Sequence, residues 1–394
     1  MNTLNKQLFA NRVNHVPKSF IREILKVASM PDITSFAGGL PNPALFPVKE
    51  LALCAEKVFN KKGTEALQYG ASEGYYPLRE FIAGRYNEKQ NLNITAENIL
   101  ITNGSQQALD LIGKVLINPG DEVLLERPTY LGALQCFGMF EPQYREVSFN
   151  EDGLDINQLK FALTDGNIKL FYSVPNFQNP TGGRYSRENR LEIAETLQQY
   201  DSITIEDDPY GEISFSDDSL PTLYSLIPEK TILLGSFSKV ISPGLRVGWI
   251  VADTEFISKI TIMKQASDLH TSNLTQHILY EYLTTNNLDQ HISQIRKVYQ
   301  NQRDVMILAI QKYFPADVRY TKPEGGMFIW LTLPVRFKAR KFLQQAMDKG
   351  IVFVPGDNFY ASRPDEQTLR LNFSNVSVDK ITDSMKILGK ILKT

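Results

Sequence analysis

The segment from about Asn98 to Asp253 alternates short apolar runs with longer amphipathic stretches, and this alternation limits the possible fold more than any other feature. The apolar runs are NILIT, DEVLLE, IKLFYSV, SITIE, TILLG and LRVGWIVAD. Helical patterns separate them, for example SQQALDLIGKVL, a stretch from Thr129, and Arg187 to Tyr200. Strands that are apolar throughout and joined by helices are typical of a parallel sheet covered on both faces. We therefore expect an α/β fold with a mainly parallel sheet.

The pattern changes beyond Thr254, where long helical stretches lead into a second, smaller α+β unit. The expected elements are a helix from Leu288 to about Tyr313, strands in GGMFIWLTL, IVFVP and TLRLNFS, and helices near Arg340 to Lys349 and Val378 to Leu392. The proline-rich stretch FAGGLPNPALFP fits neither unit, and we expect it to cross between them. We predict an N-terminal segment (1–50) that contributes to the small domain and the active site, a large domain (51–287) and a small domain (288–394).

Composition excludes several classes of function. The chain has 42 Lys+Arg and 44 Asp+Glu, a formal charge of −2, so its charge does not indicate a nucleic-acid partner. No run approaches the roughly 18 apolar residues of a membrane span, and the first residues lack a signal-peptide core. Only Cys54 and Cys136 occur, which excludes a disulfide framework and indicates a reducing compartment. We expect a cytoplasmic protein without a membrane partner.

Polar residues follow the predicted strands, at the edge where parallel sheets bind ligands. Ser105 follows NILIT, Asn179 follows IKLFYSV, Asp207 and Tyr210 follow SITIE, and Lys239 follows TILLG. Taken one by one, an N-cap serine, a plain turn and solvated turn carboxylates account for these features equally well. Lys239 is less ordinary, because a lysine beside a buried strand is costly unless it is paired, neutral or covalently used.

Taken together, the strand ends and the stretches around them resemble fold-type I pyridoxal-phosphate enzymes, and among these the class I aminotransferases. The matching stretches are SFAGGLPNPALFP, LQYGASEGYYPLRE, NFQNPTGG, EDDPYGEI, GSFSKVISPGLRVGW, KQASDLHTSNLTQ, EGGMFIWLTLP and LRLNFSN. The resemblance extends from about Ile21 to Lys390. It is strongest to 2-aminoadipate and kynurenine aminotransferases and to the aminotransferase domains of MocR-type regulators.

The resemblance implies catalytic roles around pyridoxal 5′-phosphate. Lys239 would form a Schiff base with the cofactor aldehyde and later carry a proton from the substrate Cα. Asp207 would pair with the pyridine nitrogen and keep it protonated, so that the ring accepts electrons. Asn179 and Tyr210 would hydrogen-bond the 3-oxygen of the ring.

The resemblance also implies how the cofactor is held. The phosphate would be bound by a set of small, polar and cationic residues: Gly104, Ser105, Gln106, Ser236, Ser238 and Arg246. Tyr130 would stack on the ring, although its place alone suggests core packing. Tyr69 would reach the phosphate of a neighbouring subunit, which implies a homodimer with shared sites, although by itself it is a surface tyrosine beside a glycine turn.

For the substrate, the resemblance places Arg370 at the α-carboxylate, together with Asn179, and Gly39 near the same group. Because Arg370 and Lys239 belong to different predicted domains, we expect substrate binding to draw the domains together. Arg22 would meet an acidic side chain of the substrate, such as that of 2-aminoadipate or glutamate. On an amphipathic helix, however, such an arginine is more often a solvated charge.

Other functions find less support in the sequence. His15, His270, His277 and His291 are scattered without partners at metal-binding spacing, and no G-x-G-x-x-G follows a strand. A pyridoxal-phosphate lyase on the same scaffold and a non-catalytic MocR-like effector domain stay as alternatives; the family pattern begins so early that we expect no DNA-binding domain before it. We expect a ping-pong aminotransferase with 2-oxoglutarate as acceptor and 2-aminoadipate, aromatic or broad-range donors.

Overall fold

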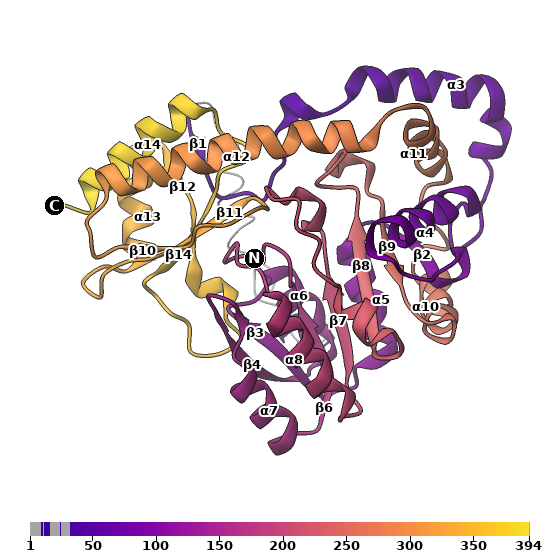
Figure 1. Ribbon diagram of the computed structural model, residues 1–394, viewed down its shortest axis with the longest axis horizontal. Coiled ribbons are helices and arrows are strands. Elements are labelled where there is room, and N and C mark those ends of the chain that lie inside the picture. Colours follow the sequence, from indigo (N-terminus) through magenta and orange to yellow (C-terminus); the bar gives the residue numbers. More distant parts are fainter. Residues whose placement is uncertain (1–8, 11, 16–23, 25–31, 394) are drawn as a thin grey trace.

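A large mixed sheet forms the centre of the computed structural model, which describes residues 9–10, 12–15, 24 and 32–393 (Figure 1). Its order is β2-β9-β8-β7-β6-β3-β4-β5. The strands, in that order, are Ile99–Thr102, Gly248–Val251, Thr231–Ser236, Ile203–Asp207, Ile168–Ser173, Glu122–Arg127, Gln143–Asn150 and Gly153–Leu154. The middle strands β8, β7, β6, β3 and β4 pair in parallel, which is the sheet that the sequence predicts.

Two strands of this sheet differ from the sequence-based expectation of consecutive parallel strands. β9 runs antiparallel between β2 and β8, so its apolar sequence does not mark a further parallel strand. β4 is absent from the sequence-based expectation because only Val147 among its residues is buried. A strand near the edge, half-buried along most of its length, lacks the continuous apolar run by which its neighbours are recognised.

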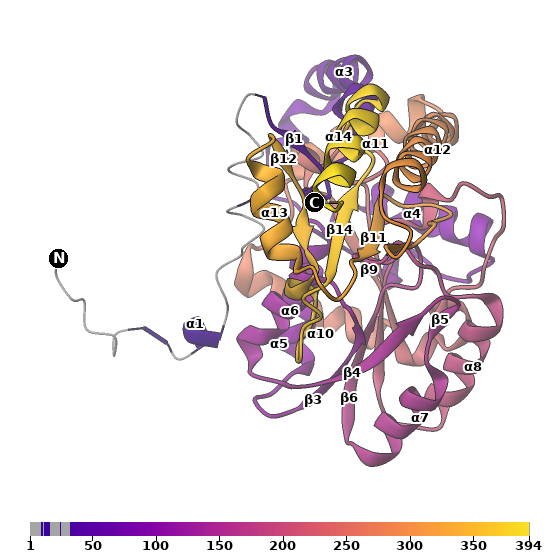
Figure 2. The same cartoon turned by 90° about the vertical axis from the view of Figure 1, so that its left-hand side faces the viewer.

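Helices cover both faces of the large sheet (Figure 2). One face carries α5 (Ser105–Leu116), α6 (Leu131–Phe137) and α10 (Thr254–Ser267), and the other carries α7 (Ile156–Asp165), α8 (Arg187–Gln198) and α9 (Leu223–Leu226). Each face has its own apolar core. Local capping fixes where these helices begin: the Ser186 hydroxyl accepts a hydrogen bond from Asn189 N before α8, and Asp155 caps α7 in the same way.

The smaller unit is a four-stranded antiparallel sheet with the order β10-β11-β14-β13. Its strands are Arg319–Tyr320, Phe328–Thr332, Thr368–Asn372 and Val354–Pro355, and its helices include α13 (Ala339–Met347) and α14 (Val378–Ile391). The stretch IVFVP divides into β12 (Ile351–Val352) and β13, which belong to different sheets. The other strands and helices predicted here form within a few residues of their expected ends.

Helix α12 (Leu288–Tyr313) joins the two units and is the longest of the described helices at 26 residues (Figure 1). It packs along α14, and Arg296 Nε donates to the carbonyl oxygen of Glu212 in the large unit at 2.9 Å. No helix in the described part of the chain is both long and apolar enough to cross a bilayer.

The N-terminal part of the described chain runs from the small unit to the large one. After α1 (Arg12–His15), strand β1 (Thr34–Ser35) pairs in parallel with β12, and Phe36 O accepts a hydrogen bond from Asn372 N at 2.8 Å. The chain then forms α3 (Val48–Ala66) and α4 (Tyr76–Gln90), which pack against α11 (Asn273–Thr285). Residues 36–42 therefore lie between the two sheets, next to the site described below.

Candidate active site

A cavity of about 700 Å³ lies beyond the carboxyl ends of β6, β7 and β8. It brings together residues from separate parts of the chain that the sequence singles out. Those lining it are Gly39, Ser105, Gln106, Tyr130, Asn179, Asp207, Tyr210, Ser236, Ser238, Lys239, Arg246 and Arg370. Such convergence follows from parallel topology, because every parallel strand delivers its carboxyl end to the same edge of the sheet.

Lys239 lies in the cavity just after β8. Its Nζ donates to the carbonyl oxygen of Gly39 at 2.9 Å. Burial, and after it the positive charges of Arg370 and Arg246, lower the pKa of the Lys239 amine to about 8, against a smaller opposing effect of Asp207. The amine is thus unprotonated far more often near neutral pH than an exposed lysine, which makes it a better nucleophile and proton acceptor.

Asp207 ends β7 and is 3% exposed. The hydroxyl of Tyr172 donates to its Oδ2 at 2.8 Å, while Oδ1 is buried and has no hydrogen-bond partner among the described residues. Burial raises the pKa of Asp207 to about 7, and the hydrogen bond from Tyr172 opposes this rise. A buried carboxylate oxygen without a partner is costly and marks a position where a ligand donor is expected.

Arg370 enters the cavity from β14 in the small unit. Its Nη1 and Nη2 donate at 2.6 Å to Asn179 Oδ1 and to the carbonyl oxygen of Ala37. The guanidinium lies 4.3 Å from the ring centre of Phe328, and burial lowers its pKa to about 10. Its buried Nε has no hydrogen-bond partner in the described part of the chain.

Tyr210 lies near Asn179 and packs edge-on against Phe328, with ring centres 5.8 Å apart. Burial raises the pKa of its phenol. Tyr130, which also lines the cavity, donates to Gln106 Oε1 at 3.4 Å, and burial raises the pKa of Tyr130 to about 12. Both phenols are therefore hydrogen-bond donors at neutral pH.

Gly104 precedes α5 with φ +79°, a backbone conformation that residues with a side chain rarely adopt. A Cβ there would lie 2.5 Å from Nη2 of Arg246, which itself has φ +53° and donates to the carbonyl oxygen of Asn103 at 2.9 Å. Ser236 and Ser238 lie at the end of β8, with their hydroxyl oxygens 2.9 Å apart. We call the group formed by Gly104, Ser105, Gln106, Ser236, Ser238 and Arg246 the anion cradle.

Gly104 and Tyr69 are not among the residues that line the cavity. Gly104 lies against the guanidinium of Arg246, which does line the cavity. Tyr69 is 77% exposed on the loop after α3, where its ring meets His270 edge-on at 5.7 Å. Arg22 lies outside the described residues.

Sequence reasoning missed Tyr172, the carbonyl oxygen of Ala37 and the rings of Phe328 and Phe359. A tyrosine inside the apolar run IKLFYSV has the signature of a core residue, and no local pattern reveals that its hydroxyl meets Asp207. The two phenylalanines likewise fall within or beside predicted strands, although both rings contact Arg370. No described group of three or more histidine, cysteine or acidic side chains is arranged to hold a metal ion.

A mainly parallel sheet with a lysine after one strand and a buried carboxylate at the end of its neighbour fits a fold-type I pyridoxal-phosphate enzyme, and solved structures similar to this chain have this fold. The profile of the family described as aminotransferase class I and II matches residues 41–388. The chain therefore belongs to the class I and II aminotransferases, and it is an aminotransferase.

Two curated relatives are each 40% identical to this chain over 98% of its length. They are aromatic-amino-acid aminotransferase 1 of Thermococcus litoralis, 94% of which is covered, and 2-aminoadipate transaminase of Thermus thermophilus, 97% of which is covered. An Escherichia coli protein named as an uncharacterized HTH-type transcriptional regulator, YdcR, is 29% identical over 95% of this chain and 80% of its own.

Solved structures agree with this assignment. The kynurenine aminotransferase of Pyrococcus horikoshii, described as a complex with PMP, superposes with a TM-score of 0.94 and 40% identity, covering 98% of this chain and 97% of that one. The α-aminoadipate aminotransferase of Thermus thermophilus, complexed with N-(5′-phosphopyridoxyl)-L-leucine, gives a TM-score of 0.92 and 39% identity at the same coverage.

Proposed function

We propose that this aminotransferase holds pyridoxal 5′-phosphate in the cavity and transfers the amino group of an amino acid to a 2-oxo acid by a ping-pong mechanism. One observation carries the proposal. Asp207 and Lys239 both line the cavity, and the buried Oδ1 of Asp207 has no hydrogen-bond partner among the described residues. A protonated pyridine nitrogen would supply the donor that this oxygen lacks.

The anion cradle fits the phosphate. A dianion needs several donors and a cation, and the cradle offers the N-terminus of α5, three serine hydroxyls and the guanidinium of Arg246. Gly104 has no Cβ where one would press on that guanidinium. Backbone and cation can therefore approach the same phosphate closely.

Tyr130 would stack on the ring of the cofactor, and Tyr210 and Asn179 would hydrogen-bond its 3-oxygen. The Oδ1 of Asn179 accepts a hydrogen bond from Arg370, which orients the amide, and its Nδ2 is the donor that would face the 3-oxygen. Asp207, held by Tyr172, would face the ring nitrogen.

When bound, pyridoxal 5′-phosphate supplies an electron sink for the pair of electrons left at the substrate Cα. Lys239 would attach the cofactor through its amine and, once displaced, take the proton from Cα. Its lowered pKa suits both tasks, because each needs the neutral amine. Arg370 would bind the α-carboxylate, with the backbone at Gly39 close by, and the rings around the guanidinium exclude water.

The test is direct. Purified protein soaked in pyridoxal 5′-phosphate should show an imine absorbance band, and borohydride reduction should fix a phosphopyridoxyl group that mass spectrometry maps to Lys239. The Lys239→Ala variant should still bind the cofactor but lose the band and nearly all turnover. A wild-type protein that stays colourless and yields no adduct would overturn the proposal.

The names of the relatives support aromatic and 2-aminoadipate donors, with 2-oxoglutarate as the acceptor that the family resemblance implies. Among the described residues, the cations lining the cavity are Lys239, Arg246 and Arg370, each with a role assigned above. A second carboxylate on 2-aminoadipate or 2-oxoglutarate therefore needs a further cation. Arg22 is the candidate that the sequence offers.

We further propose a homodimer with shared sites. Apolar side chains are exposed on α3 and the loop after it: Val48, Leu53, Phe59, Leu67 and Tyr69. A concentration of exposed apolar groups is typical of an interface, and a second copy of the chain would cover it. Tyr69 would then reach the cofactor phosphate of the partner subunit.

We also propose a division into domains that close on the substrate, and a reducing compartment. The predicted boundaries near residues 50 and 287 place Lys239 and Arg370 in different domains, which supports closure on substrate. Cys54 and Cys136 are both free and buried, which supports a reducing compartment such as the cytoplasm.

A further inference from the structure

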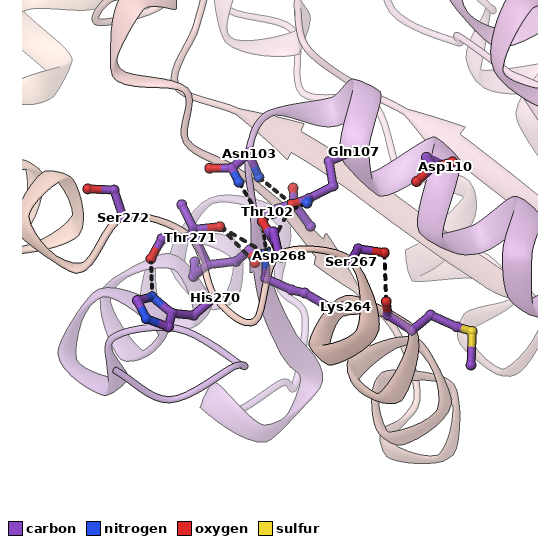
Figure 3. A network of polar contacts seen from close by, with 12 residues as sticks. Thr102, Asn103, Gln107, Asp110, Lys264, Ser267, Asp268, His270, Thr271 and Ser272 are labelled. Carbon is purple, nitrogen blue, oxygen red and sulfur yellow. Dashed lines mark hydrogen bonds and ion pairs between the residues drawn. The ribbon is translucent and has the colours of Figure 1, made fainter. Parts of the chain in front are cut away.

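Lys264 of α10 is a buried cation outside the cavity. Its residue is 0% exposed, and Nζ lies 2.9 and 3.1 Å from the two carboxylate oxygens of Asp268, one helical turn later. Nζ also donates to Gln107 Oε1 at 3.0 Å and to the Thr271 hydroxyl at 3.2 Å (Figure 3). All of these are polar partners, so the charge is fully engaged where water cannot reach it.

Asp268 extends this network from α10 to the start of α5. Its Oδ2 accepts hydrogen bonds from Asn103 Nδ2 at 2.6 Å and from Gln107 Nε2 at 2.7 Å. Figure 3 shows the side chains of Asn103 and Gln107 turned toward Asp268 and Lys264. One carboxylate oxygen therefore gathers donors from two elements that are more than 150 residues away in sequence.

Asn103 makes three hydrogen bonds that fix its position. Its side chain is bound by Asp268, its main-chain N–H donates to Gln107 Oε1 at 2.8 Å, and its carbonyl oxygen accepts from Arg246 Nη2 at 2.9 Å. Asn103 directly precedes Gly104 and Ser105 of the anion cradle. Any shift of Asn103 would therefore move both the start of α5 and the guanidinium of Arg246.

A solvent-facing pair next to this network shows what an ordinary helix pair looks like. Lys114 and Asp110 of α5 are also four residues apart, 2.6 Å from Nζ to Oδ2, but both are partly exposed. Pairs of this kind contribute little to stability. The Lys264–Asp268 pair differs in its lysine, which is fully buried, whereas Asp268 is 24% exposed, about as much as Asp110. The pair also makes four further hydrogen bonds: two to Gln107 in the first turn of α5, one to Asn103 in the loop before it and one to Thr271.

We propose that Lys264 and Asp268 are positioning residues that fix the anion cradle and thereby set the affinity for the phosphate of the cofactor. This inference rests on the proposed function, because it assumes that the cradle holds a phosphate ester. Neither residue lines the cavity, so both act through Asn103 and Gln107. The effect should be confined to ligands that carry the phosphate.

The experiment compares the binding of pyridoxal 5′-phosphate and of pyridoxal, which lacks the phosphate, to apoenzyme, followed by absorbance titration. In Asp268→Ala, Asn103 and Gln107 lose hydrogen bonds to a charged group, worth about a tenfold change in affinity or more. The dissociation constant for pyridoxal 5′-phosphate should rise by that factor, and that for pyridoxal should change less than about threefold.

A second variant keeps the test valid if Asp268→Ala leaves Lys264 buried without a partner and folds poorly. The double substitution Lys264→Met with Asp268→Leu replaces the ion pair by apolar groups, which is often tolerated in proteins. It too should lose affinity for pyridoxal 5′-phosphate only.

The matched control is Asp121→Ala. Asp121 resembles Asp268 in its exposed fraction, 26% against 24%, and in its pairing with a lysine, Lys169. It lies just before β3, at the end of that strand away from the cradle. It should change neither constant.

The outcomes separate cleanly. Unchanged affinity for pyridoxal 5′-phosphate in the folded double variant, or an equal loss for both ligands, would overturn the positioning role. A wild-type apoenzyme that binds neither ligand would overturn the proposed function itself, and this result is read before any variant is compared.

Discussion

At the scale of single residues, the site depends on buried groups whose charge state the surroundings set. Asp207 is held near its titration point by two opposing effects: burial raises its pKa to about 7, and the Tyr172 hydroxyl lowers it. In the folded apoenzyme a raised carboxylate pKa favours the protonated form. Its contribution to stability is therefore fully present below the unfolded pKa and is lost as pH rises toward about 7.

The first prediction concerns Tyr172→Phe in the apoenzyme. Removing the phenol raises the pKa of Asp207 further and leaves an ionised carboxylate without its donor, at a cost of about 1–3 kcal/mol. The loss of unfolding free energy should be larger at pH 8 than at pH 5, measured by denaturant unfolding at both values.

The control for this prediction is the same substitution in an Asp207→Asn background, where the pH-dependent part should vanish. Burial also raises the pKa values of Glu126 and Glu206 to about 7. Both residues are present in all four proteins, so their effect on the unfolding free energy cancels when the effect of Tyr172→Phe is compared between the two backgrounds. An equal loss at both pH values would contradict the assigned role of Tyr172.

The second prediction concerns Arg22. If its guanidinium meets the side-chain carboxylate of an acidic donor, Arg22→Ala should reduce kcat/KM for 2-aminoadipate or glutamate by about tenfold or more, the loss expected for a charge-assisted hydrogen bond. Aromatic and aliphatic donors should be nearly unaffected. The half-reaction of each donor, followed by stopped-flow absorbance, gives the comparison, and equal losses for all donors would remove the idea.

At the scale of elements, the connection between β2 and α5 is the part of the fold most restricted by the site. Gly104 adopts φ +79° and ψ 168°, a region that is essentially confined to glycine. The same residue sits against Arg246 and next to the loop held by Asp268.

The third prediction is that Gly104→Ala weakens binding of pyridoxal 5′-phosphate by about tenfold or more, because the new Cβ displaces the Arg246 guanidinium from a charged ligand. Gly120 also has a positive φ, +88°, and open space where a Cβ would lie, so Gly120→Ala strains the backbone without displacing a guanidinium. Thermal unfolding should show destabilisation of both variants, whereas cofactor titration should show a loss of affinity in Gly104→Ala alone. Equal affinities would show that the guanidinium position does not matter.

At the scale of the whole molecule, the proposed homodimer assigns Tyr69 to the site of the partner subunit. The fourth prediction is complementation: Tyr69→Ala and Lys239→Ala variants, each nearly inactive, should regain about a quarter of wild-type activity after mixing under conditions of subunit exchange. Half of the dimers would then be mixed, and each mixed dimer would contain one complete site. Activity that stays at the sum of the separate variants would show that Tyr69 does not act across an interface.

Much of the fold and the chemical character of the site could be predicted from the sequence. Continuous apolar runs between helical patterns identify the parallel strands, and the residues after them include Lys239, Asp207 and Asn179, because strand ends in parallel sheets meet at one edge. Gly104 and Arg246 stand in the sequence where the family resemblance implies phosphate-binding residues. Apolar runs and the residues that follow them lie close together along the chain, so they can be recognised in the sequence alone.

Only the tertiary structure decided which side chains meet. The Tyr172 hydroxyl on Asp207, the Ala37 carbonyl on Arg370 and the link from Lys264 through Asp268 to Asn103 join residues far apart in the chain. The same holds for the antiparallel course of β9, whose apolar sequence is compatible with either direction. A hydrogen bond depends on distance and angle within a fraction of an ångström, and for distant residues these are fixed by how the sheets and helices pack rather than by the order of residues along the chain.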